Sequence, residues 1–233
     1  RRPSELRNWA RRNTIYVLAD QLTESLVLWP QKTDIVGMGS DAAKTKATIK
    51  GLHVPATNTY YSTRWYNMGF QPTSAGVIMT LDDVGAGTQF HGCTFIGIDG
   101  AVTATKAIQS TAHSRLVVND CDFLGGFSGD VIDLAAGAAQ GLRITNNRIL
   151  GGAKDGIIVS GTLTHYKDVL IADNYIMVEA VTINDGADGI AVINNMCISR
   201  AGTYGAGTHV ITIGDAAGNI VVDKDGEAYT IPD

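Results

Sequence analysis

The chain has 233 residues and a net charge of −5, and its 27 glycines far outnumber its 5 prolines. This composition excludes a disordered Pro/Gly linker and favours a fold with many tight turns, and an acidic chain without a basic stripe is a poor candidate for nucleic-acid binding. The 3 cysteines are too few for a disulfide framework, and no apolar run approaches the about 20 residues that span a bilayer. We therefore expect no bound metal, no cofactor and no membrane contact.

Charge is distributed unevenly along the chain. Residues 1–50 contain nine Lys and Arg against five acidic residues, whereas residues 168–233 contain two against ten. If the fold keeps its two ends apart, one end is basic and the other acidic. Such polarity favours head-to-tail stacking of copies or docking onto a neighbouring protein.

The first expected element is a short capping helix over residues 1–13. Leu6, Trp9 and Ala10 would share one face of that helix, and the face would cover the start of the fold that follows. Because the chain begins with Arg1 and not with Met, we expect a processed product or an excised fragment.

The densest aromatic cluster lies between residues 60 and 70. Aromatic rings stack on sugars and Arg binds acidic groups, so this stretch is a candidate substrate-binding site. The same residue types anchor protein interfaces and pack beneath long loops, and that alternative remains open. The candidate residues are Tyr60, Tyr61, Arg64, Trp65 and Tyr66.

One short phrase recurs between residues 90 and 197: an apolar residue, a spacer, a small polar pair, a spacer and another apolar residue. The fourth positions are Cys93, Cys121, Asn147, Asn174 and Asn195, spaced 28, 26, 27 and 21 residues apart. Short strands at this period predict a solenoid whose coils pair about 4.8 Å apart. The three asparagines would form a ladder of hydrogen-bonded amides, and the two cysteines on successive coils are expected to be free thiols.

A second phrase, β-branched residues after a Gly or an acidic residue, alternates with the first. Its anchors are Ile78, Ile108, Ile132, Ile158, Ile183 and Ile211. Four carboxylates lie beside these anchors, and neighbouring coils would hold carboxylates about 5 Å apart, as retaining glycosidases do. Acidic residues also begin strands simply because turns are solvated, and that alternative remains open. The candidate catalytic residues are Asp130, Asp133, Asp155 and Glu179.

The Asn-Asn-x-Ile phrase, the Gly-Ile-x-Val phrase and their period resemble the right-handed parallel β-helix of pectate lyases and phage tailspikes. The segments from Thr14 to Thr48 are similar to the first coils of such proteins. The resemblance implies an all-β solenoid of about eight coils over residues 14–215. We expect residues 216–233 to close it with a hairpin around Asp225 and Gly226.

The resemblance also implies function, although many activities use this scaffold. The leading expectation is a virion-surface structural protein of a phage (tailspike, head-fibre or capsid-decoration type), trimeric, with other virion proteins as partners and host glycans as a further contact. The first alternative is an extracellular polysaccharide lyase or glycoside hydrolase. The chain lacks, however, the signature sequence that surrounds the catalytic basic residue of pectate lyases. It also lacks the paired-Asp and Gly-His-Gly motifs of polygalacturonases. The second alternative is a non-catalytic carbohydrate-binding module.

Overall fold

In the computed structural model, the residues that the structure describes form β-strands and the irregular segments between them, and none of these residues lies in a helix. The capping helix predicted over residues 1–13 falls largely outside them, and Asn13 already belongs to the first strand. The structure describes residues 12–18, 20–39, 46–56, 60–82, 87–111, 115–135, 141–160, 169–178, 183–185, 190–199, 211–212, 216–217, 220–222 and 228–230.

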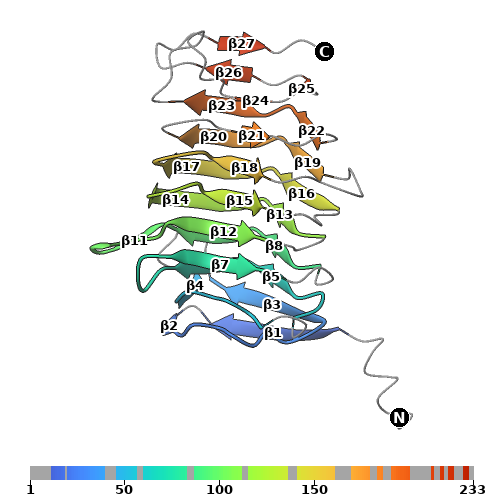
Figure 1. Cartoon of the computed structure of the whole chain (residues 1–233). Coiled ribbons are helices and arrows are strands. Elements are labelled where there is room, and N and C mark those ends of the chain that lie inside the picture. The colour runs from blue at the N-terminus through green and yellow to red at the C-terminus, as the bar shows by residue number, and fades with distance from the viewer. Residues whose placement is uncertain are drawn as a thin grey trace.

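The strands stack into a parallel β-solenoid of about five turns (Figure 1). Three sheets form its walls. Sheet A contains β1 (Asn13–Leu18), β3 (Thr33–Met38), β5 (Arg64–Tyr66), β8 (Gln89–His91), β13 (Val117–Asn119), β16 (Leu142–Thr145), β19 (Val169–Ala172), β22 (Ile190–Ile193) and β25 (Ala216–Ala217). Sheet B contains β2 (Gln21–Thr23), β4 (Ala47–Lys50), β6 (Met68–Gln71), β9 (Thr94–Ile96), β14 (Asp122–Phe127), β17 (Arg148–Gly152), β20 (Tyr175–Val178), β23 (Met196–Ser199), β26 (Ile220–Val222) and β27 (Ala228–Thr230). Sheet C contains β7 (Val77–Leu81), β12 (Lys106–Ser110), β15 (Ile132–Ala135), β18 (Ile157–Ser160), β21 (Ile183–Asp185) and β24 (Ile211–Thr212).

The prediction of about eight coils is wrong for the part of the chain that the structure describes. The described residues form about five turns, and β1 to β4 supply strands to sheets A and B only. At the other end, β26 pairs antiparallel with β27, with Val221 opposite Tyr229, in the segment where the sequence predicts a hairpin. The boundaries of the cap and of the solenoid stay predictions.

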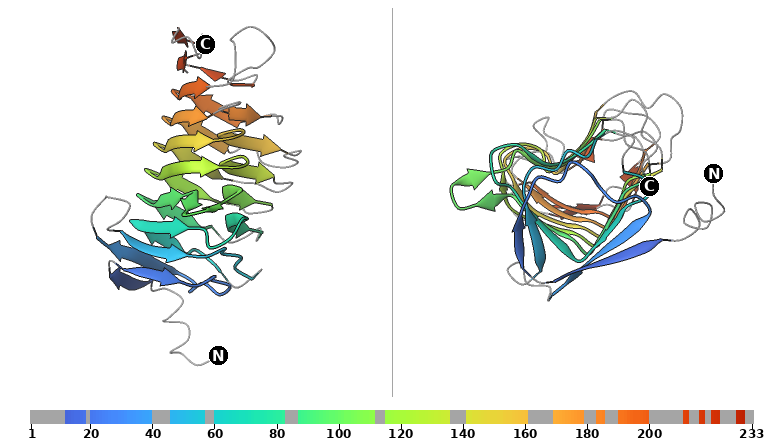
Figure 2. Two further views of the ribbon diagram at one scale, coloured as in Figure 1. Left: turned by 90° about the vertical axis from the view of Figure 1, so that its left-hand side faces the viewer. Right: turned by 90° about the horizontal axis from the view of Figure 1, so that it is seen from below.

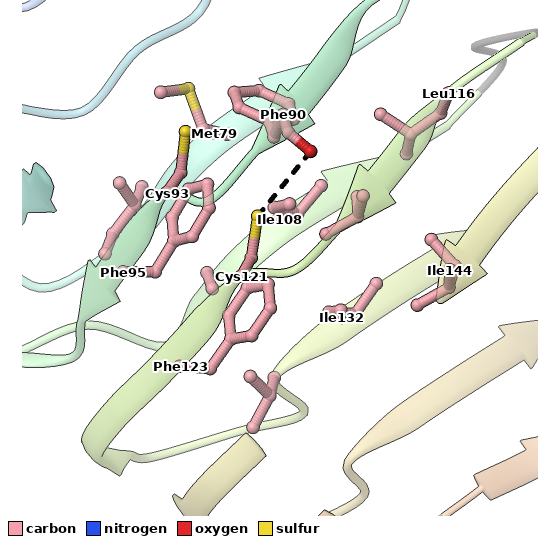
Figure 3. Close-up of a cluster of buried hydrophobic side chains, with 14 of the residues drawn as sticks. Met79, Phe90, Cys93, Phe95, Ile108, Leu116, Cys121, Phe123, Ile132 and Ile144 are labelled. Carbon is pink, nitrogen blue, oxygen red and sulfur yellow. Dashed lines mark hydrogen bonds between the residues drawn. The ribbon is translucent and has the colours of Figure 1, made fainter. Parts of the chain in front are cut away.

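Parallel pairing in register arranges the buried side chains in columns. One column of sheet B includes Phe70, Phe95 and Phe123. The rings of Phe70 and Phe95 stack with centroids 5.1 Å apart, and those of Phe95 and Phe123, both labelled in Figure 3, stack at 4.9 Å. In sheet C the aligned anchors are Met79, Ile108, Ile132, Ile157, Ile183 and Ile211. Ile78 and Ile158 of the predicted set are therefore one residue out of register.

The corner between sheets A and B repeats one backbone conformation in successive turns. Its first residue has a left-handed φ between 51° and 58° in Asn67, Gly92, Asp120, Asn146, Asp173 and Asn194. Asn, Asp and Gly are the residues that tolerate this conformation. The repeated small polar pair in the sequence is thus a requirement of the backbone turn.

In the later turns, the residue after the corner residue points inward and bonds to the neighbouring turn. Asn174 Nδ2 donates to Asn195 Oδ1 at 2.8 Å and to the Ile144 carbonyl at 2.9 Å, and Asn147 Nδ2 donates to Asn174 Oδ1 at 3.0 Å. The free thiol of Cys121 takes the equivalent position and donates to the Phe90 carbonyl at 3.6 Å (Figure 3). Thiols therefore continue the ladder that the amides form.

One corner of the solenoid carries an insertion. Between β9 and β12 the chain makes a two-stranded antiparallel hairpin of β10 (Ile98–Asp99) and β11 (Val102–Thr103), which projects from the side of the stack (Figures 1 and 2). Lys50 Nζ contacts Asp99 Oδ2 at 2.8 Å, so an ion pair ties the hairpin to sheet B.

We predict that Asn174→Leu lowers the free energy of unfolding by about 3 kcal/mol, because the Ile144 carbonyl and the amide of Asn147 would lose their buried partners. Chemical denaturation monitored by circular dichroism measures this. Asn146→Gly is the matched control, since Asn146 is exposed and Gly accepts its left-handed φ of 55°. Equal stability of the two variants would contradict the structural role of the ladder.

Candidate functional site

Two of the four candidate catalytic carboxylates meet on sheet C around one lysine. Lys106 Nζ lies 3.1 Å from Asp130 Oδ2 and also forms a short contact with Asp133 Oδ2. Asp133 is only 6% exposed, and its Oδ2 accepts a further hydrogen bond from Gln109 Nε2 at 3.2 Å. One ammonium group therefore bridges two of the carboxylates that the sequence proposes as catalytic.

The remaining two candidates lie elsewhere. Asp155 is one turn further along, where its backbone carbonyl accepts from the Val131 amide at 2.9 Å. Glu179 lies outside the described residues. The other carboxylate oxygen of Asp133, Oδ1, is buried and has no hydrogen-bond partner within the part of the chain that the structure describes.

The charge state of Lys106 follows from its surroundings. Burial by itself lowers the pKa of this lysine, but hydrogen bonds and attraction from Asp133 and Asp130 outweigh burial and raise the pKa above 10.5. Lys106 thus stays protonated at neutral pH. It can hold the two carboxylates in place, but it is not suited to accept a proton from a substrate.

The predicted aromatic site divides between the interior and the surface. Tyr60 and Trp65 are at most 1% exposed and pack edge-on against Trp29, with ring centroids 5.3 and 5.2 Å away. Tyr61 is 41% exposed, and Arg64 and Tyr66 are partly exposed on the outer face of sheet A. Packing thus accounts for Tyr60 and Trp65, and only the other three can contact a ligand.

A histidine that the sequence did not single out completes this outer face. His91, one turn beyond Tyr66, stacks on the Tyr66 ring with centroids 5.0 Å apart and planes 12° apart, and its Nε2 lies 3.1 Å from Gln89 Oε1. Burial lowers the pKa of His91, the charge of Arg64 lowers it further, and Asp34 acts in the opposite direction. The imidazole is therefore mainly neutral at pH 7, and the stacked pair forms an aromatic element on the outer face of sheet A. The alternation of His91 with the buried Phe90 could have indicated its outward position.

The first turn exposes most of the large apolar side chains found at the surface. Seven of the eleven such side chains in the described chain lie between residues 15 and 38. Ile15 and Leu22 begin interior columns, and within the described part of the chain each has a stacking partner on one side only. Figure 2 (right) looks onto this end of the solenoid. The seven residues are Ile15, Tyr16, Leu18, Leu22, Val27, Leu28 and Met38.

No group of three or more His, Cys, Asp or Glu side chains is arranged to hold a metal ion in the described ranges. Within the same ranges, no helix is long and apolar enough to cross a membrane.

No protein-family model, curated protein or solved structure significantly matches the chain.

We predict that Lys106→Met lowers the free energy of unfolding at pH 7 by about 2 to 4 kcal/mol, because it leaves the buried Asp133 carboxylate without its counter-ion. Adding Asp133→Asn should restore part of the loss, since the buried group is then neutral. Lys154→Met, at an exposed lysine, is the matched control and should change stability by less than about 0.5 kcal/mol. Additive effects of the two substitutions at 106 and 133 would show that the contact contributes nothing.

The same contact predicts a pH dependence. Because the folded-state pKa of Lys106 is raised, its stabilising contribution is complete below the ordinary pKa of 10.5 and is lost as the pH rises through the folded-state value. Thermal unfolding between pH 9 and 12 should show this loss in the wild-type chain and not in Lys106→Met. Parallel profiles for the two chains would contradict the assignment.

Proposed function

We propose that the protein is a structural β-solenoid displayed on the surface of a phage virion, of the tailspike, head-fibre or capsid-decoration type, and that it assembles through its first turn. The observation that carries this proposal is the set of exposed apolar side chains between residues 15 and 38. A monomeric protein rarely exposes such a cluster, because covering it with a partner is favourable.

The strands at this end support the same conclusion. β1 and β2 are the first strands of sheets A and B, so among the described residues each has a strand neighbour on one side only. An uncovered edge pairs readily with another chain. A second copy of the chain, in a homotrimer, or another virion protein would cover both the edge and the apolar surface.

The enzyme alternative has less support. A retaining glycosidase needs one carboxylate that donates a proton and a second that acts as nucleophile. The ammonium of Lys106 lies between Asp130 and Asp133, and this arrangement favours a structural role for both. The polysaccharide lyase and glycosidase roles are therefore not preferred.

Contact with surface glycans is a second candidate function. The Tyr66–His91 stack on the outer face of sheet A favours it, because flat rings bind the apolar faces of sugars. This role is compatible with a virion protein, which would present sheet A outward to a host surface, and equally with a separate carbohydrate-binding module.

We predict that the wild-type chain is a homotrimer by size-exclusion chromatography with light scattering. Tyr16 and Leu18 are 66% and 76% exposed, so Tyr16→Ser combined with Leu18→Ser should weaken assembly without unfolding the chain. Ile98→Ser, at an exposed apolar residue of the β10–β11 hairpin, is the matched control and should leave the oligomer intact. A wild-type chain that is monomeric at micromolar concentration would overturn the proposal.

A further inference from the structure

A cavity of about 310 Å³ lies on the corner between sheets A and B. Its wall includes Gly92, Asp120 and Asn146, which are the left-handed corner residues of three successive turns. Lys46, Asp122 and Arg148 complete the polar part of the wall. The volume is at the lower end of the range for ligand sites and suits a ligand of about one sugar unit.

Lys46 is a buried cation at this cavity. The residue is only 6% exposed. Its Nζ donates to the Gly92 carbonyl at 2.7 Å and to Thr94 Oγ1 at 2.9 Å. Both acceptors are uncharged, and no carboxylate of the described residues lies within ion-pair distance of Nζ. An ammonium group has three donors and is unfavourable to bury without a counter-charge. An anionic group in the cavity would supply both the third acceptor and the charge.

Arg148, in β17 of sheet B, provides a second cation in the wall. Its Nε contacts Asp122 Oδ1 at 2.8 Å, while its side chain stays 54% exposed, so the guanidinium has further donors available for a ligand. Arg148 and Lys46 are therefore two donors of positive charge at one cavity, and an anion can bind between donors of this kind.

The acidic residues of the wall limit the charge of the ligand. Asp120 and Asp122 balance Lys46 and Arg148, so the lining has no net charge. A polyphosphate or a nucleic acid would be repelled by these carboxylates. A ligand with a single negative charge and several hydroxyl groups fits, because the carboxylates accept hydrogen bonds from hydroxyls.

We propose that this cavity binds one acidic sugar unit, with its carboxylate or sulfate group at Lys46 and Arg148 and its hydroxyls at Asp120 and Asp122. His91 directly precedes Gly92 in the chain, and its stack with Tyr66 begins the outer face beside the cavity. A polysaccharide chain entering the cavity would continue over that face. The proposal deepens the glycan contact proposed above and rests on it, but it does not depend on the oligomeric state.

The test is a titration of the full chain with D-glucuronate, with glucose 6-sulfate and with uncharged glucose, followed by heteronuclear NMR. We expect saturable shifts of the Gly92 and Asp120 amides with at least one of the two anionic sugars and none with glucose at the same concentration. The anion that binds identifies carboxylate or sulfate as the recognised group. No saturable shift with either anion, or equal binding of glucose, would overturn the proposal.

Two variants locate the anion. Lys46→Met keeps the buried aliphatic stem, and Arg148→Gln changes a side chain that is 54% exposed. Each should weaken binding about tenfold or more. Lys154→Met and Arg143→Gln are matched controls and should bind as the wild type does. Should Lys46→Met fail to fold, Arg148→Gln decides the question alone. Wild-type affinity in a folded Lys46→Met or Arg148→Gln chain would overturn the proposal, whatever the oligomeric state of the protein.

Discussion

The structure depends on one constraint: successive turns of the solenoid pair through parallel strands in register. A residue therefore contacts the residue at the same position of the next turn, and like side chains gather in columns. The stacked rings of Phe95 and Phe123 and the bonded amides of Asn147 and Asn174 are two results of this register. Because side chains alternate between the two faces, a slip of one residue would expose a whole column of the core.

The sequence contained enough information to predict the parallel solenoid, because the corner between sheets A and B has a backbone requirement. A left-handed residue followed by Cys or Asn repeats from Gly92 to Asn195, and that pair recurs as a recognisable motif. The register of sheet C was harder to predict because Ile78 and Met79 are both fully buried, so a run of apolar residues gives no unique anchor. The number of turns was overestimated for a related reason, since the phrases do not reveal whether a layer has two strands or three.

Less of the candidate site could be predicted, because its key cations come from other turns. Lys106 lies one turn before Asp130 and Asp133, and Lys46 reaches the carbonyl of a residue 46 positions later in the chain. The repeat pattern in the sequence does not show which turn a long lysine side chain contacts. Which residues of the aromatic cluster are buried could be predicted in part from the sequence. Side chains alternate along a strand, and Trp65 accordingly points inward between the outward Arg64 and Tyr66.

The β10–β11 hairpin shows where this architecture tolerates a change in length. The hairpin satisfies its own backbone hydrogen bonds, and a side chain added at Gly100 would meet nothing within 4 Å. The extra residues leave the pairing of β9 with β14 undisturbed on the adjoining wall. This corner is thus a natural site at which evolution, or an engineer grafting a peptide epitope, can lengthen the chain and display new residues without rebuilding the rod.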